Sequence, residues 1–600
     1  MTHAAAVAAL TPQRWTDSGQ RMVAKTLTEL AYEQLLVPQP DGDGRWRLTL
    51  PGGISYTFSA RRRLWEGLRV EPGSVHRCDD RGEHDADDPT QLLLDLHEHI
   101  GADPTTTGHL VRELAVTRLA DVHIAAGPQH TAAELVDCDY ADAEGAMDGH
   151  PWLIPNKGRL GFGHADYLRY APERSAPLRL PWLAAHPRLG TWQAVRGLDH
   201  RTLRAAELDP ATRDTFSSNL ERAVRDRAAN ADISDYRWFP VHPWQLDNVV
   251  LPLFAGELAR GDLVLLGEAP DRYLPQQSIR TLTNREAPLR HHVKLPLSVL
   301  NTLVWRGLPT ERTIAAPRVT EYLHGVRDGD PFLRDECRPV LLGEVASVAV
   351  EHSGYAALPG APYQYLELLG CIWRESITGY LEPGERALTM AALLHVDPSG
   401  TPVVAALIDR SGLSVTDWIA RLLNVVLPPL LRMLYKHGVV FSPHGENAIL
   451  LHRNGIPSRL AIKDFVDDVN VSDQPLPELA DMPADVGAVL LREPADWLCQ
   501  FLWAGLFVGH FRYLGDLLET RLGLAERTFW GMVRTEITTH QSHFPDLADR
   551  YALFDLLQPR ISRICLNRNR LLLDGYADRP ERPHAATYGT VRNALHEVGR

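Results

Sequence analysis

The chain runs for 600 residues without an obvious linker, and this limits what it can fold into more than any other feature. A single hydrophobic core stops growing at about 250–300 residues, so several cores are needed. The sequence shows no internal repeat and no low-complexity stretch, and its 44% apolar and 23% charged residues are ordinary for a globular protein. We therefore predict two to four domains that pack against one another.

The first part of the chain alternates helical and extended patterns. Residues 13–36 have apolar residues at helical spacing, and residues 45–58 read as two strands around a Pro-Gly-Gly turn. Residues 79–90 are polar and acidic and predict a loop, and residues 91–120 again read as helical. We expect an N-terminal domain over residues 1–150.

The remainder predicts a mixed architecture. Residues 151–365 combine short helices with strands such as 262–266, and residues 366–600 begin with helical segments, including 414–438 behind a Ser/Thr cap. Strands are predicted at the end of 444–451 and over 459–465, and the last hundred residues read as mostly helical. The fold class expected is α+β, in three divisions.

Charge and cysteine content exclude several functions. The net charge of −14 disfavours a protein built to bind nucleic acid or anionic membrane. The six cysteines form no CxxC pair, so zinc-ribbon and iron–sulfur sites lack their spacing. No targeting segment is recognised, and the apolar run 422–431 is too short to cross a bilayer. We predict a cytoplasmic protein with reduced thiols, and neither nucleic acid nor membrane as a partner.

The densest group of polar residues is SPHGENAILL followed by KDF. A loop with His444, Glu446 and Asn447 leads into an apolar strand, and the next strand ends at Asp464 with further carboxylates beyond it. Adjacent strands would bring Asn447 and Asp464 to the same edge. Amide and carboxylate oxygens suit Mg²⁺ on nucleotide phosphates, in an order similar to that of protein kinases. The alternative is a buried turn whose polar groups satisfy backbone ends.

A second group predicts an anion site. The segment 276–284 reads as a strand that places Ser278 and Arg280 on one face and Thr281 and Thr283 on the other. Lys294 and Arg306 follow within a short distance, and three cations so close together favour phosphate binding over scattered surface ion pairs. The histidines at 291 and 292 would point to opposite faces of a strand, so a shared metal ion is not expected.

A third group surrounds Lys157 and Arg159, in the segment NKGRLGFG. It matches neither a P-loop nor a dinucleotide fingerprint, but its two cations are candidates for a carboxylate. The alternative is a glycine-rich connection with solvated charges. The chain has five lysines: Lys25, Lys157, Lys294, Lys436 and Lys463. Coding bias toward arginine explains their rarity, yet three of the five lie in these groups.

Together these segments resemble the NRPS-independent siderophore synthetases, the family of the aerobactin synthetases. The resemblance covers roughly residues 10–580, and NKGRLGFGHADYLRYAPE is most similar to the desferrioxamine and alcaligin synthetase branch. The segments that carry it are HPWLIPNKGRLGFG (150–163), VHPWQLDN (241–248), QQSIRTLTN (276–284), HHVKLPLSVLNT (291–302) with Arg306, WRES (373–376), SPHGENAILL (442–451) and KDF (463–465).

The resemblance implies a hand-like fold with a thumb (1–150), fingers (151–365) and a kinase-like nucleotide-binding palm (366–600). It also implies adenylation of a carboxylate by ATP with Mg²⁺, condensation with an amine or hydroxyl, and a homodimer. The implied ATP-binding residues are Ser278, Arg280, Thr281, Thr283, Lys294, Glu446, Asn447 and Asp464, of which Glu446, Asn447 and Asp464 would hold the metal. The implied substrate-binding residues are His150, Lys157, Arg159, Thr302, Arg306 and His444, and the implied catalytic residues are Lys294, Arg306 and His444.

One segment departs from the family. Relatives read Asn-His-Leu in the late apolar helix, whereas this chain reads Phe507-Val508-Gly509-His510-Phe511, and this difference argues against a contribution of His510 to the nucleophile pocket. Two other functions stay open from the residues alone. A kinase-like phosphotransferase would release ADP, and a ferric-siderophore binding or reducing protein would need thiolate ligands or a flavin motif.

Overall fold

The computed structural model describes residues 3–227, 232–573, 575–583 and 585–599. The N-terminal part joins a six-stranded antiparallel sheet to the helices α2 (Pro12–Tyr32), α3 (Pro89–Ile100) and α4 (Pro104–Ala126). Each of these helices begins with a proline behind a side-chain cap, so orphan amides of its first turn are satisfied. The helices predicted at 13–36 and 91–120 are confirmed. The strands of the sheet are β1 (Gln39–Pro40), β2 (Arg45–Thr49), β3 (Ser55–Arg62), β4 (Leu68–Val70), β5 (His76–Asp79) and β6 (Gly82–Asp85).

The loop predicted at 79–90 is wrong in its first half. β5 and β6 form an antiparallel hairpin, in which Cys78 pairs with Glu83 and His76 with Asp85. Every residue of β6 is exposed, so the strand carries no apolar alternation that a sequence pattern could reveal. Its backbone pairing, and not side-chain burial, defines it.

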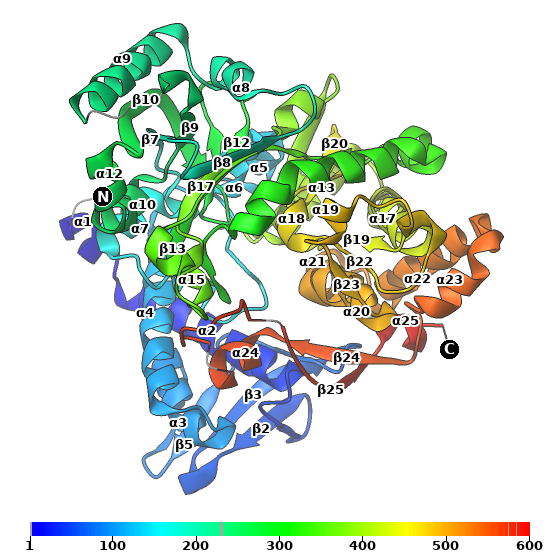
Figure 1. Ribbon diagram of the computed structural model, residues 1–600. Coiled ribbons are helices and arrows are strands. Elements are labelled where there is room, and N and C mark those ends of the chain that lie inside the picture. The colour runs from blue at the N-terminus through cyan, green and yellow to red at the C-terminus, as the bar shows by residue number, and fades with distance from the viewer. Residues whose placement is uncertain (1–2, 228–231, 574, 584, 600) are drawn as a thin grey trace.

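The middle of the chain builds an antiparallel eight-stranded sheet in the order β8-β16-β17-β12-β11-β10-β7-β9. The helix α13 (Thr310–Gly329) packs against β16 and β17, and α9 (Pro210–Asp226) packs against β10 (Figure 1). The strands are β7 (Leu178–Ala185), β8 (Gly190–Ala194), β9 (Arg237–Pro240), β10 (Leu263–Pro275), β11 (Thr281–Asn284), β12 (His292–Lys294), β16 (Glu344–Val350) and β17 (Leu369–Arg374). A separate hairpin, β13 (Leu297–Asn301) and β14 (Val304–Arg306), leads into α13.

The strand predicted over 276–284 is only half correct. β11 begins at Thr281, and the preceding residues form a turn in which the amide of Gln276 donates to the carbonyl of Thr281. Ile279 lies in the left-handed region with φ 60°, which no strand residue adopts. The alternation of polar and apolar residues through this turn imitates a strand, so the pattern alone misassigned it.

The last part of the chain pairs a small sheet with a large helical layer. The four-stranded sheet runs β15-β21-β20-β18, and α17 (Val415–Arg432) packs on β21 behind its Ser414 cap, as predicted. The strands of this part are β15 (Val340–Leu341), β18 (Glu385–Thr389), β19 (Val439–Val440), β20 (Ala448–Arg453), β21 (Ile456–Ile462), β22 (Asn470–Ser472) and β23 (Leu491–Glu493). The main helices are α16 (Val403–Ser411), α20 (Ala495–Gln500), α21 (Arg512–Leu522) and α22 (Glu526–His543), with a π-helix, η10 (Phe501–Phe511), between α20 and α21.

A late segment of the chain returns to the N-terminal part. β24 (Arg560–Cys565), β25 (Ala586–Arg592) and α24 (Leu566–Leu572) return to the N-terminal part, at the bottom of Figure 1. Buried ion pairs fix this contact, since Arg570 lies 2.6 Å from Glu113 and Arg512 lies 2.6 Å from Glu29. The strands β24 and β25 were not predicted, because the C-terminal hundred residues read as mostly helical.

Three large hydrophobic cores follow the chain in order, although each borrows residues from elsewhere. The first lies mainly between residues 22 and 114 and takes in Leu571, the second lies between residues 162 and 373, and the third is mostly C-terminal but includes Tyr32 and Trp65. The divisions at 150 and 365 stay predictions. Shorter helices connect these layers: α1 (His3–Ala8), α5 (Ala132–Asp137), α6 (Tyr140–Glu144), α7 (His164–Tyr170), α8 (His200–Glu207), α10 (Pro243–Gln245), α11 (Leu251–Leu253), α12 (Ala255–Arg260), α14 (Ser353–Ala356), α15 (Tyr363–Leu366), α18 (Phe465–Asp468), α19 (Ala484–Gly487), α23 (Ala548–Leu553) and α25 (Ala594–Glu597).

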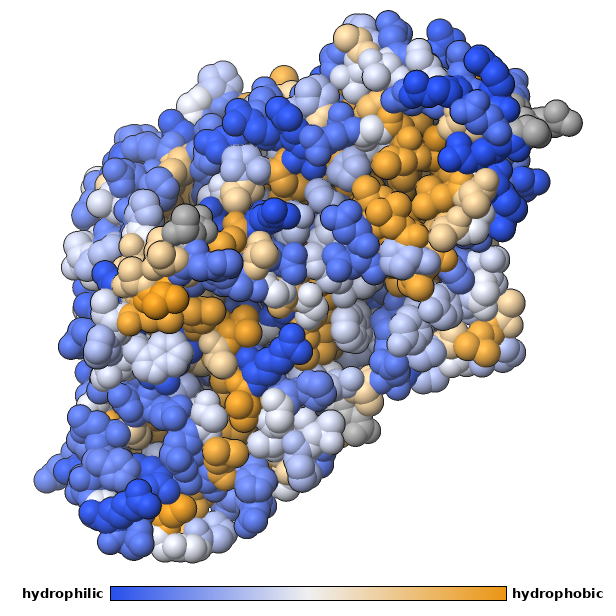
Figure 2. Space-filling model, turned by 90° about the vertical axis from the view of Figure 1, so that its left-hand side faces the viewer, coloured by the Kyte–Doolittle hydropathy of each residue, from blue (hydrophilic) through white to orange (hydrophobic). Residues whose placement is uncertain are grey.

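The surface of the protein carries both hydrophilic and hydrophobic residues. The face shown in Figure 2 is mostly hydrophilic, with apolar residues gathered in patches among the polar ones. In the part of the chain that the structure describes, no helix is both long and apolar enough to cross a membrane.

Candidate active site

The β20–β21 hairpin brings the loop of His444 to the end of the next strand. Ala448 pairs with Ile462, and the amide of Lys463 donates to the carbonyl of Asn447 at 3.1 Å. Asn447 and Asp464 therefore lie at the same edge, as the sequence predicts. The side chain of Lys463 turns away from this edge and donates to Tyr140 and Gln276 at 3.2 Å each, so Lys463 lies beside the site without facing it.

Three of the nine non-glycine residues with positive φ among the described residues lie near this edge. Ile279, Thr302 and Asp464 have φ values of 60°, 59° and 72°, in the left-handed region that β-branched residues strongly avoid. Such conformations cost about 1–3 kcal/mol each and persist where the surrounding structure holds them, often at functional sites. Three separate loops meet at one place with strained residues, which points to this place as the functional centre.

Lys294 is the hub of a buried charge cluster. It is 1% exposed, ion-pairs with Asp464, and lies 2.8 Å from Asp467 and 3.8 Å from Glu344. Burial lowers the pKa of the Lys294 ammonium, but Asp464 and Asp467 outweigh burial and the net shift is upward. Burial likewise raises the pKa of Asp464, yet Lys294 and Arg374 hold it well below its usual range. The predicted phosphate-binding lysine is therefore charged and already balanced by carboxylates.

Two arginines complete the cluster. Arg280 lies 3.1 Å from Asp467, and Arg374 lies 3.1 Å from both Asp464 and Glu344. The sequence assigned no role to Arg374, Glu344 or Asp467. Arg374 stood in the segment WRES, and Asp467 was among the carboxylates beyond Asp464, so a signal was present. Glu344 begins an apolar strand, and nothing in its neighbourhood marked it.

The predicted hydroxyls differ in their surroundings. Ser278 accepts from the amide of Thr281 at 3.2 Å and so closes the turn before β11. Thr283 accepts from Gln276 at 2.7 Å, and Gln276 in turn contacts His292 at 3.2 Å. Thr283 thus belongs to a buried hydrogen-bonded network with Gln276 and His292. The two adjacent histidines do point apart, since the neighbouring His291 ring lies 2.7 Å from Glu207 instead.

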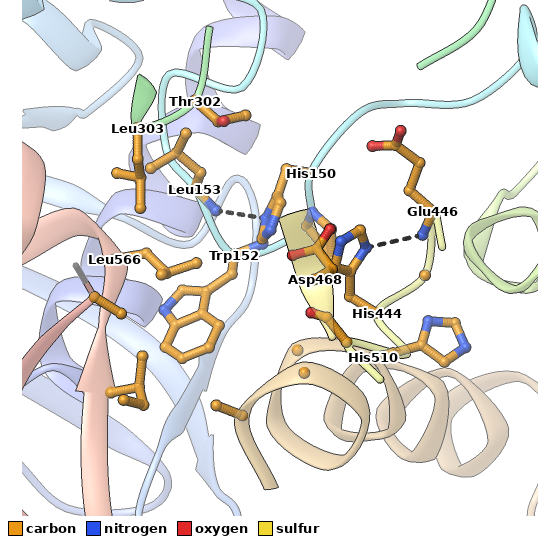
Figure 3. Close-up of a pocket in the computed structure, with 18 of the residues that line it drawn as sticks. His150, Trp152, Leu153, Thr302, Leu303, His444, Glu446, Asp468, His510 and Leu566 are labelled. Atoms are coloured by element: carbon orange, nitrogen blue, oxygen red, sulfur yellow. Dashed lines mark hydrogen bonds between the residues drawn. The ribbon is translucent and has the colours of Figure 1, made fainter. Parts of the chain in front are cut away.

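A cavity of about 730 Å³ adjoins the charge cluster. Figure 3 shows His150, Thr302, His444 and Glu446 around it, with Trp152, Leu153, Leu303 and Leu566 forming an apolar side. Arg306, Asp468 and His510 also line it. A mostly apolar cavity with a few convergent polar groups is the usual form of a small-molecule site.

Arg306 is the cation that the cavity offers. Its side chain donates to the Thr302 hydroxyl across the β13–β14 hairpin, and among the described residues no carboxylate lies within ion-pair distance of it. Its Nε has no hydrogen-bond partner there. Burial, followed by the neighbouring Arg280, lowers the pKa of Arg306 to about 10, so it remains charged at neutral pH. A partly buried guanidinium that lines a cavity and has no counter-ion among the described residues is prepared for an anionic ligand.

The histidines of the cavity are neutral. Burial lowers the pKa of His150 to about 3, with His444 adding to the shift, and burial also lowers the pKa of His444. His150 Nδ1 accepts from the amides of Trp152 and Leu153 at 3.2 Å, and His444 Nδ1 accepts from the amide of Glu446 at 3.3 Å (Figure 3). In each ring Nδ1 is an acceptor, so Nε2 carries the proton and can donate to a ligand.

The glycine-rich segment contributes less to the cavity than predicted. Lys157 is 4% exposed and does not line the cavity; its ammonium donates to Asp121 at 2.8 Å and to the carbonyl of Asp148 at 2.6 Å. Arg159 lines the cavity, but its guanidinium binds Glu173 at 2.7 and 2.9 Å. Each of the two cations has a carboxylate partner inside the protein, although Arg159 Nε has no hydrogen-bond partner among the described residues, and their contacts with a bound carboxylate stay predictions. The two side chains fix the shape of the cavity wall.

The residues at the metal edge suit a hard cation. Asn447 donates through its amide nitrogen to Asp468 at 2.8 Å, which leaves the amide oxygen available, whereas Asp467 Oδ1 lies 3.7 Å from both Arg312 and Arg582. Burial raises the pKa of Asp468 to about 7, with Asp464 and Asp467 adding to it. No cluster of three or more metal-ligating side chains is preformed within the described residues. That arrangement fits Mg²⁺, which keeps waters and phosphate oxygens among its ligands.

Buried histidines also make stability depend on pH. Burial lowers the pKa of His242 to about 3, and this side chain is 0% exposed. Below about pH 6.5 the unfolded chain gains a proton that folded His242 refuses, so the free energy of unfolding falls by about 1.4 kcal/mol per pH unit as pH drops. Above pH 6.5 both states are neutral and the effect vanishes. The measurement is the free energy of unfolding in urea at pH 7, 6 and 5. For His242→Asn this free energy should fall less steeply with decreasing pH, by the contribution of one proton, whereas the exposed control His130→Asn should keep the wild-type slope. The same slope in all three proteins would contradict this prediction.

Comparison with known proteins identifies the family. The sequence profile described as "IucA / IucC family" matches residues 139–395. The rhizobactin siderophore biosynthesis protein RhbF of Rhizobium meliloti (strain 1021) is 40% identical over 98% of this chain and 96% of its own length. The chain belongs to the IucA/IucC family of siderophore synthetases. The predicted resemblance is thereby confirmed, and the protein is an ATP-dependent carboxylate–amine ligase of siderophore biosynthesis.

Other relatives of this family agree in sequence and in fold. The aerobactin synthase of Escherichia coli is 35% identical over 94% of this chain and 95% of its own length. The solved aerobactin synthetase of Klebsiella pneumoniae superposes with a TM-score of 0.85 at 32% identity, covering 98% of this chain and 99% of that one. The mixed α/β fold is that of the family. The placement near the desferrioxamine and alcaligin branch stays a prediction.

A second profile, described as "Ferric iron reductase FhuF-like transporter", matches residues 416–579. The two cysteines of that range, Cys499 and Cys565, are buried, and burial raises the pKa of both thiols. The synthetase relatives cover this range together with the rest of the chain. The reductase function considered from the sequence is therefore not favoured, and neither is the ADP-releasing phosphotransferase.

Proposed function

We propose that the protein joins the carboxylate and ATP into an acyl adenylate with loss of pyrophosphate, and then transfers the acyl group to an amine or hydroxyl with loss of AMP. Arg306 carries this proposal: a partly buried guanidinium, with no carboxylate partner among the described residues, lines a cavity beside a cluster of phosphate-binding candidates. A carboxylate and a triphosphate repel each other, so a site that joins them must supply cations. The arrangement of Arg306, Arg280 and Lys294 meets this need.

Two groups of residues divide the work. We assign the nucleotide phosphates to Ser278, Arg280, Thr281 and Lys294, with Thr283 supporting β11 from inside. Arg306, Thr302, His150 and His444 face the carboxylate from the cavity, where neutral Nε2–H groups and the guanidinium donate to its oxygens. Arg306 and His444 offset the charge that builds on the α-phosphate during attack.

Mg²⁺ fits the edge formed by Asn447, Asp464 and Glu446, to which the structure adds Asp467 and Asp468. When bound there, it would neutralise phosphate charge and make pyrophosphate a better leaving group. In the structure Lys294 and Arg374 hold Asp464 in place, so its carboxylate is ordered before any cation arrives. These ion pairs keep the ligand set assembled.

The second step needs a neutral nucleophile. Its nitrogen lone pair forms the bond to the acyl carbon, the bond from that carbon to the AMP oxygen breaks with its electron pair, and the nitrogen gives up a proton that the AMP phosphate can take. Holding amine and adenylate in one cavity turns this into an effectively unimolecular step.

We further propose that the three divisions form a thumb, fingers and a kinase-like palm, and that the protein acts as a cytoplasmic homodimer. The β20–β21 hairpin, with Asn447 and Asp464 at one edge, supports the comparison with the kinase palm. Candidate carboxylates are citrate, a citryl intermediate and a succinyl-hydroxamate, with an amine or hydroxylamine as partner. Rhizobactin and aerobactin assembly by its relatives supports this range. Light scattering of the purified protein tests the dimer.

The reaction type has a direct test. The purified protein is incubated with ATP, Mg²⁺, an amine and each candidate carboxylate, and the nucleotide products are separated by ion-exchange chromatography. AMP and pyrophosphate should appear in equal amounts and only with a productive carboxylate. Production of ADP and phosphate instead would overturn the adenylation mechanism.

Asn447→Ala should weaken Mg²⁺ use more than carboxylate binding. The substitution removes an amide oxygen from the proposed metal edge and the hydrogen bond to Asp468. We expect the Mg²⁺ concentration for half-maximal AMP release to rise about tenfold, with the carboxylate KM nearly unchanged. Asn454→Ala, in the exposed turn at the far end of the same hairpin, serves as a control. An unchanged Mg²⁺ dependence would remove Asn447 from the metal site.

A further inference from the structure

Two segments that are far apart in the chain form the apolar side of the cavity. Trp152 lies in the loop that follows His150, and Leu566 begins α24. Figure 3 shows these two side chains close together. Among the described residues no strand pairing joins the two segments, so side-chain contacts have to hold them in place.

Glu33 joins the two segments. It directly follows α2 as its C-cap residue and is 0% exposed. Its Oε1 accepts from the indole Nε1 of Trp152 at 3.0 Å and from the backbone and side-chain nitrogens of Asn567 at 2.9 and 2.8 Å. Its Oε2 accepts from the amide of Arg568 at 2.6 Å. One carboxylate therefore binds the cavity loop and the first turn of α24 at the same time.

Asn567 closes the connection from the other side. Its side-chain oxygen accepts from the amide of Ile154 at 3.0 Å, and its side-chain nitrogen also donates to the carbonyl of Trp152 at 3.2 Å. Asn567 is 1% exposed and Trp152 is 2% exposed. Glu33, Trp152 and Asn567 therefore form a closed and buried network that fixes the two segments relative to each other.

A charged side chain is unfavourable at the position of Glu33. Burial raises the pKa of Glu33 to about 7, although the amides of Asn567 and Arg568 act against burial. The C-terminal end of a helix also disfavours negative charge. Four donor groups nevertheless converge on the two oxygens, and an amide side chain could not accept from all of them, because its NH2 group would face a donor. The carboxylate is thus matched to the contacts that it makes, at a cost in stability.

Trp152 passes this constraint on to His150. The amide of Trp152 donates to His150 Nδ1 at 3.2 Å, as does the amide of Leu153. These bonds set the direction in which the His150 ring presents its Nε2–H to a ligand. Because Glu33 holds the indole of the same Trp152, a movement of Trp152 away from Glu33 also displaces the His150 ring.

We propose that Glu33 is a positioning residue of the synthetase, which holds Trp152 and the first turn of α24 together and so keeps His150 aligned with the carboxylate substrate. Glu33 does not line the cavity, and it acts through Trp152. The proposal rests on the role proposed above for His150. It gives α2, none of whose residues lines the cavity, a part in the reaction.

The first test separates the two substrates of adenylation. ATP–pyrophosphate exchange needs only the carboxylate and ATP, and each is varied in turn. Glu33→Met keeps most of the side-chain volume but removes both acceptor oxygens, so kcat/KM for the carboxylate should fall about a hundredfold, the size of effect that a misplaced reactant produces. The KM for ATP should not change, because the phosphates are assigned to β11, the turn before it and β12. Glu33→Gln keeps one acceptor oxygen and should recover most of the loss.

Glu98→Gln is the matched control. Glu98 is an exposed residue near the end of α3, in the same part of the chain, and its substitution should leave both KM values at those of the wild type. An unchanged carboxylate KM in Glu33→Met, or a lower rate with neither KM changed, would mean that Glu33 only supports the fold. Either result would overturn the proposal.

The second test isolates the contact between Glu33 and Trp152. Trp152→Phe removes the indole N–H and keeps an aromatic ring, so it remains informative even if Glu33→Met does not fold. It should raise the carboxylate KM, and it should impair the wild type more than it impairs Glu33→Met, which has already lost the contact. Equal factors in the two backgrounds would show that the residues act independently. That result, or a wild-type carboxylate KM in Trp152→Phe, would contradict the proposal.

A third measurement does not depend on catalysis. The backbone amides of Asn567 and Arg568 donate to Glu33, so their hydrogen–deuterium exchange should be faster in Glu33→Met than in the wild type and in Glu98→Gln. Equal hydrogen exchange in all three proteins would show that Glu33 does not hold α24.

Failure of the proposed function has a different signature. A wild-type protein without pyrophosphate exchange over the carboxylate panel would refute the proposed adenylation. Calorimetric titration of the wild type and Glu33→Met with the same carboxylates would still decide the role of Glu33: weaker binding by Glu33→Met would support it, and equal affinity would overturn it. The two failures are therefore distinguishable.

Discussion

Arg306→Ala should lower the rate of acyl-adenylate formation by about 10²–10³-fold or more, the cost of removing one preorganised charge from a transition state. The guanidinium is partly buried, and among the described residues its one hydrogen bond goes to the Thr302 hydroxyl, so its charge is available to the reactants. Deleting it removes the attraction for the carboxylate and the stabilisation of charge on the α-phosphate together. The loss should therefore appear in both kcat and KM.

The fold should survive this substitution, because no ion pair is broken. We expect the melting temperature of Arg306→Ala to stay within a few degrees of the wild type, since a buried charge without a counter-ion costs stability and does not supply it. Pyrophosphate exchange with each candidate carboxylate is the measurement. Arg334→Ala removes an exposed guanidinium that pairs with Asp335 and serves as the matched control. Wild-type exchange in Arg306→Ala would eliminate the proposed carboxylate site.

Lys294→Met should abolish ATP use and also destabilise the protein. Lys294 is 1% exposed and compensates Asp464 and Asp467. Removing one partner of a fully isolated buried ion pair costs about 3–5 kcal/mol, and here the cost should be smaller because Arg374 still pairs with Asp464 and Arg280 with Asp467. The same removal deletes the cation assigned to the nucleotide phosphates, so this substitution, unlike Arg306→Ala, should reduce activity and stability together.

The pH dependence of that cost provides a check. In the wild type, Lys294 and Arg374 hold the pKa of Asp464 below its usual range, so this stabilisation is present above the unfolded pKa of about 4 and is lost as pH falls through the folded value. Without Lys294 the carboxylates protonate more readily, and the difference from the wild type should shrink as the pH of urea unfolding is lowered from 7 to 4.

Two lysine variants complete the experiment. Lys436→Met, on the π-helix η8 (Met433–His437), removes a lysine that has no ion pair among the described residues, and it should change neither property. Lys294→Arg keeps the charge but brings a planar fork into a space built for an ammonium, so ATP use should fall although part of the stability returns. A constant stability difference at all pH values would show that Lys294 does not stabilise through these carboxylates.

Part of the site could be predicted from the sequence because contacts between residues close in the chain determine it. The loop of His444 and the strand ending at Asp464 are close in the chain, so hairpin pairing alone brings Asn447 and Asp464 to one edge. The Lys463 side chain turns away from Asp464 because successive side chains of a strand point to opposite faces. The strand expected over 276–284 failed at Ile279, whose positive φ no alternation pattern signals.

Contacts between segments that are far apart in the chain could not be predicted from the sequence. Lys157 and Arg159 are cations in a flexible-looking segment, and only the fold shows that Asp121 and Glu173 satisfy them. Glu344 gives no signal within its apolar strand, yet it braces Arg374 at 3.1 Å. The sequence around His510 differs from that of the relatives and gave no role for this residue. The structure places His510 at the cavity, where neither ring nitrogen has a hydrogen-bond partner among the described residues.

The sequence by itself determined the family, the reaction type and the local elements that carry Lys294, Arg306, His444 and Asp464. These depend on residue identity and on spacing along the chain, which a sequence states directly. The tertiary structure alone decided which charges are free. Arg306 has no counter-ion among the described residues whereas Lys157 and Arg159 do, and this depends on partners that chain folding brings from far away. Charge compensation in a buried site is set by three-dimensional neighbours, and so the chemistry of the site is settled only when the chain is folded.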